Sequence, residues 1–237
     1  MAEIKLMKAM NTTKVANKGY IEGWIHKFNP EERILTGRSY LVAKRLFDLT
    51  VVFLTSPFWA PILLLIGLAI WIDSPGASVM FFQNRTGRGG KRFSMYKFRS
   101  MVSNAEELKQ TYMHLNELQW PDFKITNDPR ITRVGRILRK SSMDELPQLL
   151  NVLKGEMTLV GPRPTSFGAE TYQLWQTERL DVTPGITGLW QVFGRASMEF
   201  DDRLRLDIAY IERRSLWLDF NILLKTVTAV FESRGAH

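Results

Sequence analysis

LTVVFLTSPFWAPILLLIGLAIWI, residues 49–72, is a run of 24 residues without a charge. A run of about 20 apolar residues is enough for a helix to span the hydrocarbon core of a bilayer. The run lies too far from the start of the chain to be a signal peptide. We therefore expect a membrane segment that stays in the mature protein.

The middle of this run holds Ser56-Pro57, followed by Pro61. A proline removes a backbone hydrogen bond and clashes with the carbonyl four residues earlier, which predicts a kink. The Ser56 hydroxyl can satisfy part of the freed backbone. The sequence therefore predicts a membrane helix over residues 44–73 that is broken in its middle.

Basic residues stand on both sides of the membrane run, although a basic flank normally marks the cytoplasmic side. A re-entrant hairpin that enters one leaflet, bends at Ser56-Pro57 and returns would place both flanks in the cytoplasm. A single span with a proline kink is the alternative. The basic residues are Arg33, Arg38, Lys44 and Arg45 before the run, and Arg85, Arg88, Lys91 and Arg92 after it.

Residues 1–43 are predicted to form a basic arm in front of a single domain, residues 44–237. Within the arm, apolar side chains recur at helical spacing. Such a patch either lies on a membrane surface or packs on the body of the protein, and the sequence leaves both open. Its members are Tyr20, Ile21, Trp24, Ile25 and Phe28.

Residues 74–237 are predicted to form a cytoplasmic globular part, so that the fold is α+β and mainly α. Two β-leaning stretches, Val79–Gln83 and Arg92–Phe98, flank a glycine-rich turn and predict a small β-hairpin. Strand alternation puts Lys97 and Arg99 on one face. The last helix is expected to meet either the core or the membrane interface. The expected helices are Asn104–Asn116, Arg130–Lys140, Asp144–Lys154, Ala169–Gln176, Asp201–Arg213 and Leu216–Phe231.

The composition narrows the chemistry that this chain can perform. There is no cysteine and there are only three histidines, which argues against disulfides, thiolate nucleophiles and histidine-based metal cages or triads. The formal charge is +8, from 32 basic and 24 acidic residues. An excess of this sign indicates a polyanionic partner, namely nucleic acid, anionic lipid or a phosphorylated small molecule.

The densest functional signal runs from Arg139 to Pro164. Ser142-x-x-Glu145 fits a capping box, which puts Asp144 and Glu145 in the first turn of a helix. The simplest interpretation is that both acids only cap that helix. However, the nearby cations outnumber them. These cations are Lys97, Arg99, Arg133, Arg136, Arg139, Lys140 and Arg163.

Arginines that converge on a helix N-terminus predict a phosphate site. Adjacent carboxylates in such a site can hold Mg²⁺, which prefers oxygen ligands and bridges to substrate phosphates. An aspartate can also attack phosphorus and form an aspartyl-phosphate. Asp144 and Glu145 are therefore the candidate catalytic and metal-binding residues.

Several short motifs follow one another from Lys44 onward. They are Lys44-Arg45-x-Phe47-Asp48, Ser56-Pro57, Tyr96-Lys97-Phe98-Arg99-Ser100-Met101, Asp128-Pro129-Arg130-Ile131-Thr132, Asp144-Glu145-Leu146-Pro147-Gln148, Gly161-Pro162-Arg163-Pro164 and Pro184-Gly185-Ile186-Thr187-Gly188. In this order they resemble the bacterial sugar transferase family, the monotopic phosphoglycosyl transferases. These enzymes are polyprenyl-phosphate hexose-1-phosphate transferases.

The resemblance implies transfer of a hexose-1-phosphate from a UDP-sugar to polyprenyl (undecaprenyl) phosphate, as the first membrane step of exopolysaccharide or O-antigen-type glycan synthesis. It implies Mg²⁺ as cofactor, a location at the bacterial inner membrane, a catalytic part on the cytoplasmic face, and a re-entrant break at Ser56-Pro57. Asp144 would attack the β-phosphate and release UMP, and Glu145 would help to bind Mg²⁺ or position the acceptor. The residues that would bind substrate phosphates are Lys97, Arg99, Arg136 and Arg163.

Asp207, in the segment Asp207-x-x-Tyr210, also resembles an active-site position of the family. The alternative is that Asp207 is an acid on a helix surface near Arg203 and Arg205. Residues 188–192 resemble members that act on glucose or galactose.

Other functions compete with this interpretation. A conventional metal-dependent glycosyltransferase would use Asp201-Asp202 as its metal site, and a membrane-anchored scaffold would have a dead site. A nucleic-acid binder would interleave exposed aromatics with basic residues, whereas most aromatics here lie in or beside apolar segments. The expected partners are UDP-sugar, polyprenyl phosphate and membrane lipids, without nucleic acid. A homodimer is left open.

Overall fold

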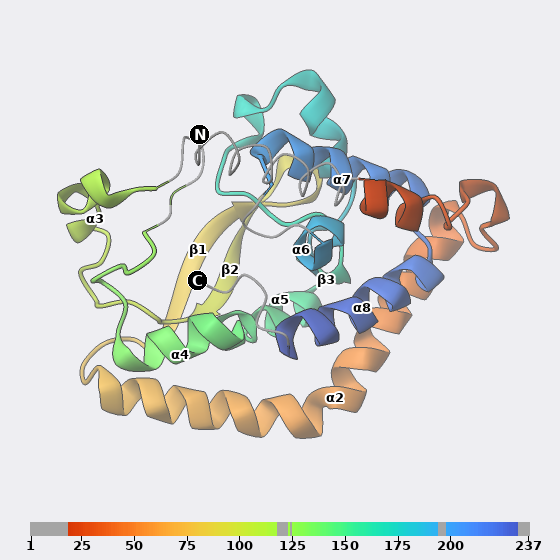
Figure 1. The fold of residues 1–237 in the computed structure, drawn as a ribbon. Coiled ribbons are helices and arrows are strands. Elements are labelled where there is room, and N and C mark those ends of the chain that lie inside the picture. The colour runs from red at the N-terminus through yellow and green to blue at the C-terminus, as the bar shows by residue number, and fades with distance from the viewer. Residues whose placement is uncertain (1–18, 118–122, 124, 194–197, 232–237) are drawn as a thin grey trace, which may run out of the picture.

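The protein is mostly helical, with two small sheets, in a computed structural model that describes residues 19–117, 123, 125–193 and 198–231. This confirms the predicted class, α+β and mainly α. The long helix α2 runs along one side, and the other elements gather above it (Figure 1). The elements are η1 (Pro30–Glu32), α2 (Gly37–Asp73), β1 (Met80–Thr86), η2 (Arg88–Gly90), β2 (Arg92–Phe98), α3 (Leu108–Thr111), η3 (Met113–Leu115), α4 (Arg133–Ser141), η4 (Met143–Glu145), α5 (Gln148–Lys154), β3 (Thr158–Val160), η5 (Ala169–Thr171), η6 (Leu174–Asp181), β4 (Gly185–Thr187), α6 (Leu189–Phe193), α7 (Phe200–Arg213) and α8 (Leu216–Phe231), where η marks a 3₁₀ helix.

Helix α2 is continuous and bent, with both prolines inside it. Figure 1 shows two arms that meet at an angle. Pro57 has no N–H for the carbonyl of Phe53, and the Ser56 hydroxyl donates to that oxygen at 2.8 Å. The Trp59 indole N–H donates to the Val52 carbonyl at 3.0 Å. The predicted bend and the predicted role of Ser56 are therefore present, within one helix that begins before Lys44.

Polar contacts fix the first arm of α2 to the globular part. Lys44 is buried with its Nζ 2.9 Å from Asp219 Oδ2 of α8. Arg45 donates from Nη2 to the Leu153 carbonyl at 2.9 Å, at the C-terminal end of α5. Both cations were counted above as basic flanks of the membrane run. Because they bond to acceptors inside the protein, the basic charge that flanks the membrane run comes from the other basic residues.

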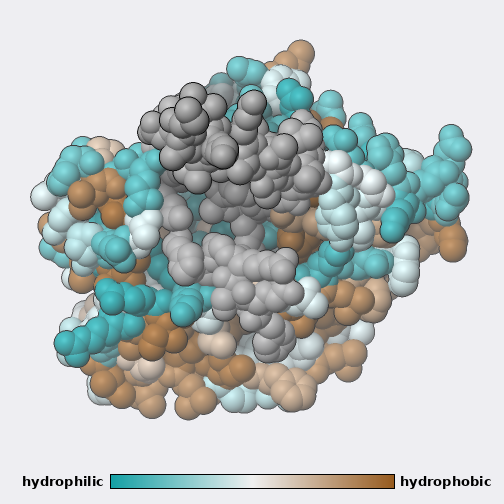
Figure 2. Space-filling model, viewed as in Figure 1, coloured by the Kyte–Doolittle hydropathy of each residue, from teal (hydrophilic) through white to brown (hydrophobic). Residues whose placement is uncertain are grey.

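One side of α2 and one side of α8 expose large apolar side chains. Among the described residues, α2 is the one helix long and apolar enough to cross a membrane, and only 11% of its most apolar window is buried. Helix α8 buries Leu218 and Ile222 in the core, so its opposite face is the exposed one. Figure 2 shows the apolar surface along the edge that α2 occupies. The exposed residues include Phe53, Leu54, Phe58, Leu64, Leu65, Leu68, Trp71 and Ile72 of α2, and Trp217, Phe220, Leu224 and Val227 of α8.

The apolar patch of the arm packs on the body of the protein. Residues 19–25 are helical, and Ile21 and Ile25 are 1% and 4% exposed. The rings of Trp24 and Phe193 are 4.9 Å apart, and Lys225 Nζ lies 5.3 Å from the centre of the Trp24 ring. This decides between the two alternatives for the patch. The rest of the arm, residues 1–18, lies outside the described residues.

The predicted hairpin is confirmed, with β1 and β2 antiparallel and Phe81 opposite Lys97. The second sheet, in which β3 pairs in parallel with β4, was not predicted. With three residues in each strand, it leaves no periodic signal in the sequence. A Cβ on Gly185 would lie 2.1 Å from the backbone nitrogen of Gly161. Glycine is therefore needed where the start of β4 approaches the residue after β3.

Three of the expected helices are wrong in extent. Asn104–Asn116 contains only the short α3 and η3, and Ala169–Gln176 forms 3₁₀ turns. Asp144–Lys154 is divided into η4 and α5, because the chain first makes a tight 3₁₀ turn. The helices α4, α7 and α8 occur where they were expected.

Candidate active site

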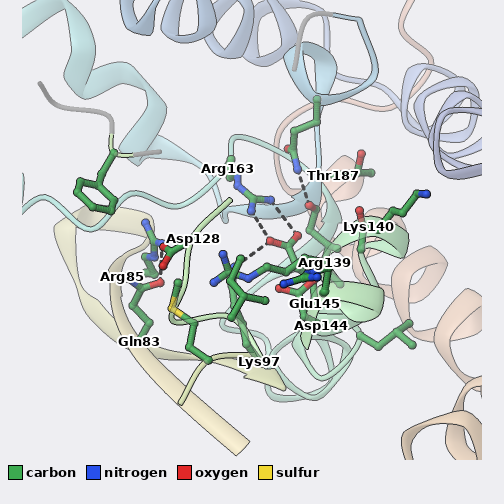
Figure 3. A pocket seen from close by; sticks show the side chains of 18 of the residues that line it. Gln83, Arg85, Lys97, Asp128, Arg139, Lys140, Asp144, Glu145, Arg163 and Thr187 are labelled. Atoms are coloured by element: carbon green, nitrogen blue, oxygen red, sulfur yellow. Dashed lines mark hydrogen bonds and ion pairs between the residues drawn. The ribbon is translucent and has the colours of Figure 1, made fainter. Parts of the chain in front are cut away.

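Two adjoining cavities, of about 1080 and 840 Å³, form one cleft. We call them the larger and the smaller lobe. Lys97, Asp144 and Arg163 line both, so Asp144 stands where the lobes meet, whereas Glu145 lines only the larger lobe. Figure 3 shows these side chains in the larger lobe. The larger lobe alone is lined by Arg136, Lys140, Leu146, Leu149, Ile186 and Val192. The smaller lobe alone is lined by Arg99, Phe167, Arg179, Phe200 and Asp207.

A backbone turn directs the acidic pair into the cleft. Ser142 ends α4 in the left-handed conformation, with φ at 57°, and is the one described residue other than glycine with a positive φ. Such a conformation costs about 1–3 kcal/mol and is concentrated at functional sites. Ser142 makes no side-chain cap, so the predicted capping box is wrong. Glu145, its expected partner, is bound by two cations instead.

Glu145 is held between Lys97 and Arg163. Lys97 Nζ lies 2.9 Å from Glu145 Oε1, and Arg163 Nη1 lies 3.0 Å from Oε2. Arg163 Nη2 also donates to Oε1, which makes the contact bidentate. Burial alone would raise the pKa of Glu145, but the two cations hold it well below its usual range. Glu145 is therefore a charged anchor for two cations that face the cleft.

Asp144 makes no hydrogen bond or ion pair with another described residue, although it lines both lobes. Burial raises the pKa of Asp144, while Lys97, Arg139 and Arg163 pull it down. Arg139 itself is oriented by a 2.9 Å hydrogen bond from its Nε to the Ser100 hydroxyl. Asp144 is therefore a carboxylate without a hydrogen-bond partner among the described residues, and it lies near several cations.

The turn that carries Arg163 is fixed from two sides. Gly185 N donates to the Pro162 carbonyl at 2.9 Å. Arg179 Nη2 donates to the Arg163 carbonyl at 2.5 Å and lies 2.7 Å from Asp207 Oδ2. Asp207 is 1% exposed, so the alternative of a helix-surface acid is wrong. Its contacts make it a positioning residue for Arg163, acting through Arg179.

The other predicted cations divide between the lobes. Arg136 and Lys140 line only the larger lobe, and Arg99 only the smaller one. Arg133 lines neither lobe, because it is exposed outside the cleft. The prediction that all of the nearby cations converge on the acidic pair is therefore wrong for Arg133.

Two cations of the cleft, Arg85 and Arg179, were not predicted as site residues. Arg85 Nη2 donates to Gln83 at 2.6 Å, and burial together with the charge of Arg163 lowers the pKa of Arg85 to about 10. A bound anion near Arg85 would stabilise the charged guanidinium and raise its pKa again. The hairpin offered a signal, because Gln83 and Arg85 lie two residues apart on β1 and share a face of the sheet with Lys97. No local pattern marks Arg179.

The fit of the site to Mg²⁺ rests on Asp144. Among the described residues, no group of three or more acidic or histidine side chains could hold a metal. Both oxygens of Glu145 already accept hydrogen bonds from cations. Asp144 is free to ligate, and Mg²⁺ commonly combines one or two carboxylates with water and substrate phosphates. The residues present therefore fit a metal that arrives with a phosphorylated substrate.

Stability should fall as Asp207 loses its proton. Burial raises the pKa of Asp207 to about 7, against the pull of Arg179 and Arg203. Between the ordinary carboxyl value and about 7, the folded protein holds a proton that the unfolded chain has lost, which favours folding at the acidic end. We expect unfolding free energy to fall from about pH 5 to about pH 7, by at most about 1.4 kcal/mol per pH unit from this group.

The measurement is thermal unfolding of the detergent-solubilised protein across this pH range. Asp207→Asn removes the titrating group, so the variant should show a flatter dependence on pH. Equal slopes for the parent and the variant would contradict the assignment.

The structure thus brings together a carboxylate among cations in a cleft and, in α2, an exposed helix long and apolar enough to cross a membrane. The model of the family described as bacterial sugar transferase matches residues 39–233. The chain belongs to the bacterial sugar transferase family.

Curated relatives support this assignment. The chain is 43% identical to the galactosyl transferase CpsE of Streptococcus agalactiae, over 84% of this chain and 44% of the relative. It is 42% identical to the undecaprenyl-phosphate galactose phosphotransferase of Salmonella typhimurium, over 86% of this chain and 43% of the relative. It is 38% identical to the exopolysaccharide production protein ExoY of Rhizobium meliloti, over 89% of this chain and 95% of the relative. The chain thus spans less than half of the first two relatives and nearly all of the third.

Proposed function

We propose that this protein transfers a hexose-1-phosphate from a UDP-sugar to polyprenyl phosphate, releasing UMP. The observation that carries the proposal is the free Asp144 carboxylate at the junction of two lobes, surrounded by Lys97, Arg139 and Arg163. The name of the Salmonella relative describes transfer of a phosphorylated sugar to undecaprenyl phosphate. The name of the Rhizobium relative points to exopolysaccharide production as the pathway served.

The reaction proceeds in two displacements at one phosphorus atom. A carboxylate oxygen of Asp144 attacks the β-phosphorus of the UDP-sugar, and the bond to the bridging oxygen breaks, so that UMP leaves with the electron pair. A phosphate oxygen of the lipid then attacks the same phosphorus and expels the Asp144 carboxylate. Arg163, Lys97 and Arg139 stabilise the negative charge in both transition states. Mg²⁺, bound by Asp144 and the pyrophosphate, would neutralise phosphate charge.

We propose further that α2 is re-entrant and that the globular part lies on the cytoplasmic face of the inner membrane. Both arms of the helix contact the same globular part. The first arm pairs Lys44 with Asp219, and the end of the second accepts a hydrogen bond at Asp73 from Val134 N, 3.4 Å away. Because these contacts lie at opposite ends of the apolar stretch, a straight crossing would separate them. With the bend, both ends of α2 would lie on the same side of the membrane.

The competing functions find less support. Asp201 and Asp202, the metal site of a conventional glycosyltransferase, line neither lobe. A dead scaffold would not need a strained turn at Ser142 to present Asp144 and its cations to a cleft.

The test is an assay of the detergent-solubilised protein with polyprenyl phosphate, Mg²⁺ and a panel of UDP-sugars that includes glucose and galactose. We expect UMP as the released nucleotide and a lipid product that carries sugar and two phosphates. Release of UDP, with a product lacking the second phosphate, would identify a conventional glycosyltransferase. No product with any UDP-sugar would support the scaffold.

A further inference from the structure

We infer that the larger lobe is the subsite of the lipid acceptor, a phosphomonoester on a long apolar chain. This inference rests on the proposed function and adds that the two lobes bind different substrates, the acceptor in the larger lobe and the donor in the smaller one. In it, Arg136 and Lys140 of α4 bind the acceptor phosphate, and the apolar wall of the larger lobe receives the adjoining part of the chain.

The apolar wall connects the cleft with the membrane helix. Leu146, Leu149, Ile186 and Val192 line the larger lobe and not the smaller one. Leu146 also packs on the cluster in which Ile66 of α2 is buried. Leu146 therefore places the apolar wall of the larger lobe directly against the part of the core that the second arm of α2 helps to form. An apolar wall of this kind can receive the first part of the acceptor chain, because contact with it removes apolar surface from water.

The two cations lie on α4, the helix next to the second arm of α2. Arg136 and Lys140 are one helical turn apart, so their side chains share a face of α4. Both are exposed and both line the larger lobe. Figure 1 places α4 directly over the second arm of α2. Ile137, on another face of the same helix, is 69% exposed. The helix thus offers basic side chains to the lobe and an apolar side chain outside it.

The smaller lobe approaches Asp144 with a different set of residues, and we assign it to the soluble donor. It is lined by Arg99 and by the rings of Phe167 and Phe200, which meet edge to face at 5.9 Å. Asp144 and Arg163 line both lobes. The donor and the acceptor can therefore approach the same carboxylate from different sides in the two displacements.

The test compares an Arg136→Ala/Lys140→Ala variant with a matched control, Arg133→Ala, which removes an exposed cation of the same helix outside the cleft. One measurement is the single-turnover burst of UMP with a UDP-sugar and no acceptor. The other is kcat/KM for polyprenyl phosphate at saturating UDP-sugar. We expect the double variant to keep the burst and to lose roughly tenfold or more in kcat/KM for the acceptor, because two hydrogen bonds to a charged phosphate are removed. The control should behave as the parent.

The charge-conserving swap Arg136→Lys/Lys140→Arg should restore most of the acceptor kcat/KM. An unchanged acceptor kcat/KM in the double variant would overturn the inference while the proposed function stood. Loss of the burst in the double variant would also overturn it, because the cations would then serve the donor. Absence of a burst in the parent would instead contradict the proposed two-step function.

Discussion

The Asp144→Asn variant is expected to release UMP at least about 1,000-fold more slowly than the parent, since loss of a nucleophile removes the covalent route and leaves only binding and electrostatic effects. The parent, incubated with UDP-sugar and no acceptor, should gain the mass of one sugar phosphate, and the variant should not. The asparagine keeps the shape of Asp144 and loses its charge, so the phosphates should still bind. Intact-protein mass spectrometry and a UMP assay measure the two effects.

Two further variants sharpen this test. Asp144→Ala should show the same loss, which excludes slow deamidation of the asparagine as a source of residual activity. Glu145→Gln should react slowly but still form the adduct, because it weakens the hold on Lys97 and Arg163 without removing the nucleophile. An Asp144→Asn variant with normal turnover, or an adduct that persists in it, would end the assignment of Asp144 as the nucleophile.

The acidic pair illustrates what sequence alone can predict about a site. The order of residues around Asp144 identified both acids and most of the surrounding cations, because these share one stretch of chain or one strand face. It did not predict which acid is free. That difference arises from Arg163, which reaches Glu145 from a turn eighteen positions later in the sequence. The sequence motif is local, but the ion pairs that divide the two roles are tertiary.

Other motifs stabilise particular turns and backbone contacts, and the sequence alone could not predict these roles. Arg130 pairs with Asp128 at 2.6 Å, and both are buried, so the Asp-Pro-Arg motif shapes its own loop. Gly161 and Gly185 permit the close approach of the two backbones beside the β3–β4 pairing, which orients the Arg163 turn. Long-range packing decides such roles, and the short parallel sheet has no periodicity of its own. The long helices were predictable because their apolar stripes are long.

Replacing Asp219 by alanine is expected to destabilise the protein by about 3–5 kcal/mol, the range for removing one partner of a buried ion pair. Asp219 is fully buried in α8, where it accepts hydrogen bonds from Tyr210 at 2.6 Å, Lys44 at 2.9 Å and Tyr40 at 3.2 Å. Without Asp219, the Lys44 ammonium keeps only Asp48, 3.6 Å away, and Asp48 is already bonded to Thr158. Lys44 would then be a buried charge without adequate compensation. Because Lys44 belongs to the first arm of α2, the loss should also loosen the attachment of this helix.

Thermal unfolding in detergent measures the effect, and the ion pair Arg213–Glu212, whose carboxylate is exposed, supplies the control. Glu212 is 59% exposed at its side chain, so Glu212→Ala should cost less than about 1 kcal/mol. The double variant Lys44→Met/Asp219→Leu should recover part of the loss, because it removes the uncompensated ammonium, while Asp48 keeps its hydrogen bonds from the Thr158 hydroxyl and Leu159 N. A double variant as unstable as Asp219→Ala alone would show that the two tyrosine hydroxyls, rather than the Lys44 charge, depend on Asp219. The attachment of α2 would then rest on a hydrogen-bond network and not on the ion pair.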